Sequence, residues 1–394
     1  MAPDAGALSG YDDLGDGSDR NATPVCSIAG KPMQQKEIHV RKVSSRSTVL
    51  FLVVAAVAAM VAAGAGASVG KKAAGVQVCG LMPDTKTSVR WLLFDQPALI
   101  KAFKAAGVSA RVVNAQGDPQ KQKTQADQCI SDGAKVLIIA PIDSGSAAAI
   151  EKAAAAKGVK SIDYDRQVEG GNAVLYASFN GHTVGVLQGT AVAGALKSKK
   201  GAVVAELNGG QEDANSFLFK GGYDSVLSPL YKSGALKHGP DQFVPGWDNQ
   251  KAGTIFEQML VKTGNKIDGV AAANDGIANA VVVALKAHKL KPVPVSGQDA
   301  TAQGVQNIIS GWQTMTVFKD VRKLAAAAAA AAVDIVKGKA VPTTGTVKTK
   351  GRATEPAFLI APQSITKANY TLLFTTGFLK KSDVCNGTYT QYCK

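Results

Sequence analysis

The chain of 394 residues is poor in the side chains from which metal sites and acid–base pairs are usually built. It has four histidines (His39, His182, His238 and His288) and no C-x-x-C pair among its five cysteines. Because zinc sites draw their ligands from closely spaced Cys and His residues, we predict no metal site. No nucleophile stands beside a base, so any acid–base pair would consist of carboxylates. We therefore expect a protein that is not an enzyme.

Signals for nucleotides and nucleic acids are also missing. No G-x-G-x-x-G or P-loop pattern follows a predicted strand, so we expect no cofactor. The net charge of +14 would suit a nucleic-acid partner, but Lys and Arg are dispersed among acidic residues. We therefore expect no nucleic-acid binding. The densest basic run, residues 36–46, directly precedes an apolar segment, which offers another explanation for it.

That apolar segment covers residues 48–70, carries no charge and is long enough to span a bilayer. One interpretation is a signal peptide with an A-x-A-like cleavage site near Ala65–Ala67, in which case Met33 is the natural start. Another is an uncleaved membrane anchor, and a third is a buried core helix. The first two place the rest of the chain outside the cytoplasm. Residues 1–47 are expected to be a disordered tail or to reflect a misassigned start.

The cysteines fit an exported protein. Cys385 and Cys393 flank the short stretch "CNGTYTQYC" near the C-terminus, so we predict a disulfide between them in an oxidising compartment. Cys79 ends an apolar strand, and Cys129 lies on a predicted helix. For these two, a bridge and a buried free thiol both remain open.

Short apolar strands alternate with amphipathic helices from residue 75 onward. A first series runs to the strand "AVLYASFN", and a second series of the same kind begins near Thr183 and includes "VPVSGQD" as a strand. Such alternation predicts an α/β protein with two domains, each a mostly parallel sheet covered by helices on both faces.

Polar and aromatic side chains follow most of the predicted strands. In open α/β sheets ligands bind beyond the carboxyl ends of the strands, so we expect these residues to converge on one cleft between the domains. The candidate ligand-binding residues are Arg90, Trp91, Asp165, Arg166, Asn215, Trp247, Asn274, Asp299 and Lys319.

The chemistry of this set suits a neutral polyol. Carboxylates accept hydrogen bonds from sugar hydroxyls, Arg and Lys donate them, and Asn does both. The two tryptophans can cover the apolar C–H faces of a sugar ring. The mixed charges argue against a phosphate site.

Each residue also has a purely structural explanation. Either Trp can be a packing residue, Asp165 and Arg166 can form an ion pair with each other, and Asn274 with Asp275 can cap a helix. Asp165 and Asp299 could mimic a glycosidase pair. We instead expect each of them beside an Arg or Lys that keeps it ionised.

Several segments resemble one known family. They are "SVRW", "SIDYDR", "VGVLQG", "EDANSFLFKGG", "VPGWDNQKA", "NKIDGVAAANDG", "VSGQDAT" and "QTMTVFK". In this order the chain resembles the periplasmic sugar-binding proteins of ABC transporters, in the xylose-binding branch of the ribose-like family, from about Val76 to Phe378. The resemblance implies a type I periplasmic binding protein fold, with two Rossmann-like lobes joined by three crossovers.

The resemblance also implies boundaries and roles. The first lobe would comprise residues 75–179 and 320–357, and the second lobe residues 180–319 and 358–394. The nine candidate residues would contact a monosaccharide such as an aldopentose, with Trp91 and Trp247 on either side of the ring. The expected protein is an extracytoplasmic monomer that delivers the sugar to a permease and is attached to the membrane only if the apolar segment is uncleaved. The alternative is a membrane-anchored sugar sensor.

One segment departs from the family pattern. The family's "SFDN" reads "SFNG" here, so Asn180 replaces a carboxylate. We expect this change to alter which hydroxyl groups are recognised at the hinge. The sequence does not identify the sugar.

Overall fold

The computed structural model describes residues 75–85 and 88–393. The predictions for the N-terminal tail, for a start at Met33 and for the apolar segment at residues 48–70 therefore lie outside the described residues. Within the described part of the chain, no helix is both long and apolar enough to cross a bilayer.

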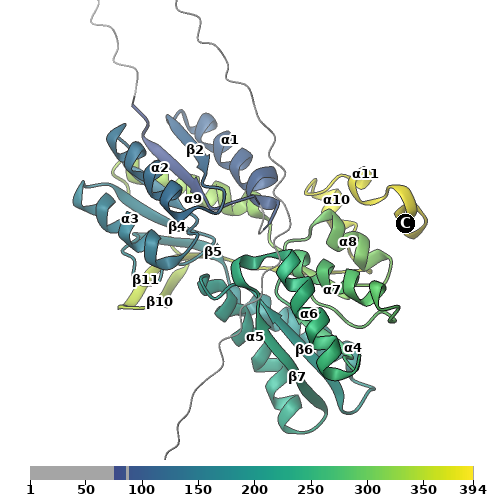
Figure 1. Ribbon diagram of the computed structural model, residues 1–394. Helices are drawn as coiled ribbons and strands as arrows, with labels where there is room; N and C mark the ends of the chain where they lie inside the picture. The colour runs from purple at the N-terminus through teal and green to yellow at the C-terminus, as the bar shows by residue number, and fades with distance from the viewer. Residues whose placement is uncertain (1–74, 86–87, 394) are drawn as a thin grey trace, which may run out of the picture. The chain divides into compact units, whose positions relative to one another are not determined.

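Seven strands form the first sheet, in the order β10-β11-β5-β4-β3-β1-β2 (Figure 1). The pairings from β11 to β2 are parallel, and the β10–β11 hairpin at one edge is antiparallel. The hairpin was not predicted from the sequence. The strands are β1 (Val78–Met82), β2 (Ala110–Asn114), β3 (Val136–Ile139), β4 (Lys160–Tyr164), β5 (Leu175–Phe179), β10 (Gly345–Thr349) and β11 (Arg352–Ile360).

Helices cover both faces of this sheet and complete the first lobe. Val78 and Met82 of β1 belong to the hydrophobic cluster under α1 and α9, and Cys79 and Leu81 to the cluster under α2 and α3. This period of two is expected for a strand that is buried on both faces. Cys79 forms a disulfide with Cys129, which decides between the two alternatives left open. The helices are α1 (Gln96–Ala106), α2 (Pro119–Ser131), α3 (Ser144–Ala156) and α9 (Val321–Val336).

The second lobe contains a three-stranded parallel sheet, β7-β6-β8, and an antiparallel pair, β12-β9. Residues of β9 share a hydrophobic cluster with the three-stranded sheet. The elements are α4 (Gly181–Leu196), β6 (Ala202–Asn208), α5 (Ala214–Lys232), β7 (Leu236–Phe243), α6 (Asn249–Thr263), β8 (Gly269–Ala272), α7 (Asp275–Ala287), α8 (Ala302–Ile309), β9 (Met315–Phe318) and β12 (Gln363–Thr366).

The predicted strand at residues 293–299 is wrong. The segment makes only two isolated bridges, from Val295 to Val270 and from Gln298 to Val317. Pro294 lies inside the segment and has no N–H group to donate, so a regular ladder cannot continue through it. The helix α8 that follows was not predicted.

The chain crosses between the lobes three times, after β5, after β9 and after β11. This confirms the predicted fold of two α/β lobes joined by three crossovers. Beyond β12, the short helices α10 (Leu372–Thr375) and α11 (Lys381–Val384) precede a 3-10 segment, η3 (Gly387–Tyr392). The predicted disulfide between Cys385 and Cys393 is confirmed in this region.

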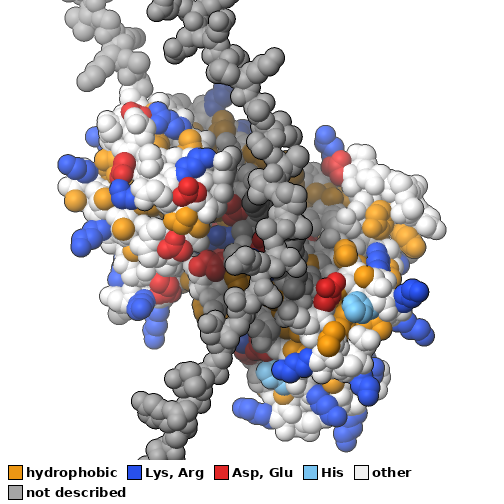
Figure 2. Space-filling view, viewed as in Figure 1, with side chains coloured by type: hydrophobic (Ala, Val, Ile, Leu, Met, Phe, Trp, Pro, Cys, Tyr) orange, Lys and Arg blue, Asp and Glu red, His pale blue; other side chains and the backbone are white. Residues whose placement is uncertain are grey.

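The basic residues are distributed over the surface. On the face shown in Figure 2, Lys and Arg side chains project from both lobes, and Asp and Glu lie among them on the first lobe. The dispersion of charge along the sequence is therefore also a dispersion in space on this face.

Candidate functional site

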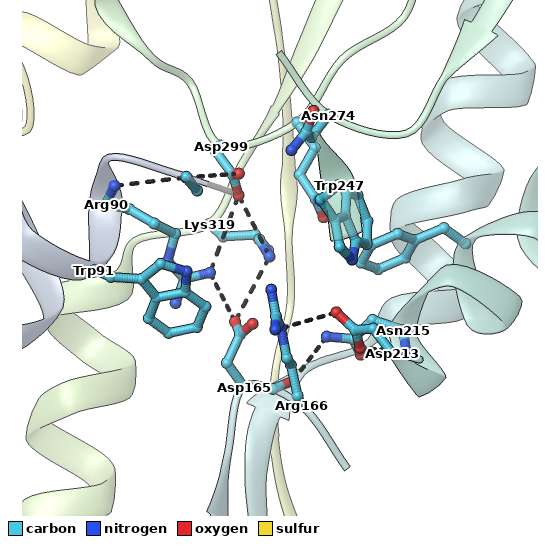
Figure 3. A pocket seen from close by; sticks show the side chains of 13 residues that line it. Arg90, Trp91, Asp165, Arg166, Asp213, Asn215, Trp247, Asn274, Asp299 and Lys319 are labelled. Atoms are coloured by element: carbon cyan, nitrogen blue, oxygen red, sulfur yellow. Dashed lines mark hydrogen bonds and ion pairs between the residues drawn. The ribbon is translucent and has the colours of Figure 1, made fainter. Parts of the chain in front are cut away.

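All nine candidate residues line a single pocket between the two lobes (Figure 3). The carboxyl ends of the parallel strands in both lobes face this pocket, which explains why residues far apart in the sequence meet there. Four residues outside the candidate set complete the lining: Ser88, Asp213, Phe219 and Gln298. The structure thus brings the nine residues together, and their role in binding a ligand stays a prediction.

Arg90 is the centre of the first-lobe half of the pocket. It precedes a π-helical turn, η1 (Trp91–Asp95). Its guanidinium contacts Asp95 at 2.8 Å and Asp165 at 2.7 Å. Burial opposes the charged form of Arg90, but the two carboxylates outweigh this and raise its pKa well above the usual value. Arg90 therefore remains a cation while it is 3% exposed.

Asp165 is held in the pocket through its backbone as well as its side chain. Its φ of 65° lies in the left-handed region, which non-glycine residues seldom adopt. Its carbonyl oxygen accepts hydrogen bonds from Ser178 Oγ at 2.6 Å and from Asn215 Nδ2 at 3.0 Å. Burial would raise the pKa of its carboxyl, but Arg90 and Lys319 outweigh this and lower it to about 2. The side chain is therefore an anion at neutral pH.

Arg166 pairs across the lobes rather than with its neighbour Asp165. Its Nε lies 2.8 Å from Oδ2 of Asp213, and its Nη1 donates to the Pro141 carbonyl at 3.1 Å. Asp213 also caps α5 by accepting from the Asn215 N–H at 2.9 Å. The suggested pair of Asp165 with Arg166 is therefore not observed. Asp213 lies in the loop that follows β6, and this position was the signal that could have included it in the candidate set.

Asp299 and Lys319 lie together, although only Lys319 follows a regular strand, β9. Lys319 Nζ is 3.5 Å from Asp299 Oδ1 and 3.6 Å from Asp165 Oδ1. Arg90 Nη1 is 4.0 Å from Asp299 Oδ1, and Ser88 Oγ donates to Asp299 Oδ2 at 3.3 Å. The prediction that each of the two aspartates lies beside a cation is confirmed.

The two tryptophans lie on opposite sides of the pocket in Figure 3, and both are buried. The Arg90 guanidinium lies 4.4 Å from the centre of the Trp91 ring. The Trp247 ring packs against Phe219 with centroids 6.3 Å apart. A Cβ on Gly209 would lie 2.1 Å from the Trp247 ring, so the absence of a side chain there makes room for the indole.

Asn274 has the structural role proposed for it as well as a place in the pocket lining. It is the N-cap of α7, and its Oδ1 accepts from the Ile277 N–H at 2.9 Å. By contrast, Asn180 is exposed and caps α4 by accepting from the Thr183 N–H at 3.0 Å. It is not among the residues that line the pocket. The structure therefore places Asn180 at a helix start outside the pocket lining, and the effect of this change on the recognised hydroxyl groups stays a prediction.

The charges that line the pocket balance. Three carboxylates (Asp165, Asp213 and Asp299) face three cations (Arg90, Arg166 and Lys319). The remaining space is about 30 Å³, measured as the volume open to the centre of a water-sized sphere. One water needs roughly 10–15 Å³ by this measure, so the space in this arrangement holds about two or three waters.

A second group of polar side chains lies away from this pocket, on β6 and β7. Glu206, His238 and Asp241 place their ligand atoms close enough to hold a metal ion. However, Lys220 Nζ already contacts Glu206 and lies 2.9 Å from Asp241 Oδ2. Two of the three side chains are therefore already paired with an ammonium group.

Comparison with known proteins agrees with this geometry. Residues 79–340 match the family model described as "Periplasmic binding protein domain". The D-xylose-binding periplasmic protein of Escherichia coli is 33% identical over 307 residues, which cover 77% of this chain and 92% of that protein. The multiple sugar-binding periplasmic receptor ChvE of Rhizobium radiobacter is 33% identical over 325 residues, covering 77% of this chain and 91% of the receptor.

Two solved structures are similar over most of their length. A carbohydrate transporter solute-binding protein from Chloroflexus aurantiacus, in complex with D-glucose, has a TM-score of 0.72 at 30% identity, covering 78% of this chain and 97% of that one. An ABC transporter solute-binding protein from Clostridium phytofermentans, with bound β-D-glucose, has a TM-score of 0.74 at 30% identity, covering 78% of this chain and 99% of that one.

Proposed function

The chain belongs to the periplasmic binding protein family, and from that premise we propose that it captures a neutral monosaccharide in the interlobe pocket. The proposed ligand is a xylose-like aldopentose or a related aldose. The protein acts outside the cytoplasm as a monomer and delivers the sugar to the permease of an ABC transporter. The family consists of solute-binding proteins, so no chemical step is part of the proposal.

The balance of charge in the pocket lining is the observation that carries the proposal. Three carboxylates and three cations leave no net charge for a phosphate or a carboxylate ligand to neutralise. Ionised carboxylates and Arg or Lys side chains are nevertheless strong hydrogen-bond partners for hydroxyl groups. The two buried indoles supply apolar area for the C–H faces of a sugar ring. The solved relatives that carry D-glucose support the same class of ligand.

The proposal includes movement of the lobes. The pocket is lined by residues of both lobes, and its free space in the present arrangement is about 30 Å³. Contacts that cross between the lobes, including Arg166 with Asp213 at 2.8 Å and Asn215 with Asp165 at 3.0 Å, hold the pocket shut. We infer that the lobes separate about the three crossovers to admit the sugar and close again around it.

The test is a calorimetric panel of D-xylose, D-glucose and other neutral pentoses and hexoses, with a uronic acid and a sugar phosphate as charged controls. We expect at least one neutral aldose to bind and the charged analogues to bind far more weakly. X-ray scattering with the same sugars should show compaction at saturation. Tighter binding of a charged analogue, or no binding of any neutral sugar, contradicts the proposal.

A further inference from the structure

Asp299 reaches the pocket from a stretch of backbone that its own sequence does not favour. We call residues 297–301 the Asp299 segment. Asp299 has a φ of 92° and Ala300 a φ of 49°, both in the region that L-amino acids seldom adopt. In the described part of the chain, this segment belongs to no regular helix or strand. Its conformation must therefore be held by contacts from neighbouring residues.

The carboxylate of Asp275 contacts the Asp299 segment on both sides of Asp299. Oδ2 accepts from the backbone N–H of Thr301 at 2.8 Å and from its hydroxyl at 3.1 Å. A Cβ on Gly297 would lie 2.2 Å from Oδ1, and a Cβ on Gly304 would lie 2.2 Å from Oδ2. The carboxylate thus occupies a slot between two glycines, one of which begins the segment.

Asp275 is itself fixed in place. Its backbone N–H donates to the Gln298 carbonyl at 3.0 Å. Gln313 Nε2 donates to Oδ1 at 2.8 Å and also to the Met315 carbonyl at 3.0 Å, which ties the carboxylate to β9. Asp275 is 2% exposed, and no ion pair joins it to a Lys or Arg within residues 75–85 and 88–393. It therefore acts through hydrogen bonds to the segment and not through a countercharge.

We propose that Asp275 is a positioning residue that clamps the Asp299 segment and so directs the Asp299 carboxylate into the pocket. The inference rests on the proposed function, in which Asp299 accepts hydrogen bonds from the sugar. Asp275 does not need to touch the ligand for this role. It also links Asp299 to Asn274, because the same helix start carries both Asn274 and Asp275.

The clamp gives sugar binding a dependence on pH. Burial raises the pKa of Asp275 to about 7. Hydrogen bonds from Gln313 and Thr301 lower the pKa by a smaller amount, and the negative charge of Asp299 raises it further. The ionised carboxylate accepts all three hydrogen bonds, whereas the neutral acid carries a proton on one oxygen. Sugar affinity should therefore fall as the pH decreases through about 7.

Fold stability should change in the opposite direction. The folded-state pKa lies above the usual value, so the contribution of Asp275 to stability is fully present at low pH and is lost as the pH rises through about 7. If sugar affinity and fold stability change in opposite directions with pH, Asp275 acts as a positioning group. A side chain that only supports the fold would not give this result. Asp95 and Asp213, whose pKa values burial also raises, remain in the variant tested below.

The experiment compares the full chain with its Asp275→Asn variant by calorimetric titration of D-xylose and D-glucose across neutral pH, with circular dichroism as a folding control. We expect Asp275→Asn to weaken binding about tenfold and to flatten the pH profile. The matched control is Asp118→Asn, because the Asp118 carboxylate also accepts hydrogen bonds from backbone amides but lies outside the pocket lining. It should keep wild-type affinity and the wild-type pH profile.

A second measurement does not depend on any sugar. Amide hydrogen exchange of residues 297–301 should be faster in Asp275→Asn than in the wild type, and unchanged in Asp118→Asn. Wild-type protection in Asp275→Asn would overturn the clamp, as would wild-type affinity with an unchanged pH profile. If the wild type binds neither sugar, the choice of ligand in the proposed function fails, while the exchange rates still decide whether Asp275 holds the segment.

Discussion

The two halves of the pocket differ in how much of their hydrogen-bonding capacity is already used inside the protein. In the first lobe, Arg90 is paired with Asp95 and Asp165, and the Asp165 carbonyl accepts several hydrogen bonds. In the second lobe, Trp247 Nε1, Gln298 Oε1 and Asp299 Oδ1 have no hydrogen-bond partner within the described residues. All three atoms are buried and belong to the pocket lining.

Buried polar atoms are nearly always paired in folded proteins, so unpaired ones indicate a missing partner or a functional role. The first-lobe half is therefore preorganised by its own ion pairs, whereas the second-lobe half keeps a donor and acceptors for the ligand. Preorganisation on one side lowers the entropy that must be lost on binding. The difference leads to distinct expectations for mutations on the two sides.

The largest expected effect is on stability, from Arg90→Gln in the first lobe. Removing this cation leaves Asp95, which is 0% exposed, without its countercharge. Breaking a buried ion pair in this way costs about 3–5 kcal/mol of unfolding free energy. Urea denaturation measures the change.

The matched control for Arg90 is Arg111→Gln. Arg111 pairs with Asp132 at 2.6 Å, but its side chain is 39% exposed. Surface pairs contribute about 0–1 kcal/mol, so this variant should be close to wild type. If Arg90→Gln is as stable as Arg111→Gln, the first-lobe half is not held together by its ion pairs.

The next effect is on affinity, from Trp247→Ala in the second lobe. Loss of a buried aromatic anchor removes roughly 1–3 kcal/mol or more of binding free energy. The variant should remain folded by circular dichroism and bind the sugar at least about tenfold more weakly by calorimetry. Trp312→Ala is the control, since Trp312 lies in the same lobe outside the pocket lining and should bind as the wild type does.

The smallest expected effect comes from the same Asp→Asn substitution made once in each lobe, at Asp299 and at Asp165. This pair of variants compares the two halves of the pocket most directly. Asp299→Asn should weaken sugar binding, by less than the loss of about 1.5–3 kcal/mol expected for Asp299→Ala. It should change the unfolding free energy only slightly, since the ion pairs of Asp299 with Lys319 and Arg90 are long, at 3.5 and 4.0 Å. Asp165→Asn should instead lower stability, because that carboxylate pairs with Arg90 and Lys319. If Asp299→Asn lowers stability as much as Asp165→Asn does, the two halves do not differ in how far they are held together by ion pairs within the protein.

Much of the first lobe was predictable from local patterns. Strands such as β1 and β3 are short apolar runs between helices, and their burial on both faces follows from that composition. The helix cap at Asn274 could be read from the sequence because capping depends on residues that are close along the chain. In the segment at residues 293–299, Pro294 was a local signal against a regular strand, whereas the rest of its form depends on side chains from other elements.

The sequence by itself indicated which residues lie near the carboxyl ends of the strands, because strand polarity and helix alternation are local properties. This was sufficient to bring all nine candidate residues into one pocket. The tertiary structure alone decided which charges pair. Asp165 pairs with Arg90, 75 positions away, and its neighbour Arg166 pairs with Asp213 in the other lobe. Ion pairs form between groups within a few ångströms in space, and sequence distance carries little information about that separation.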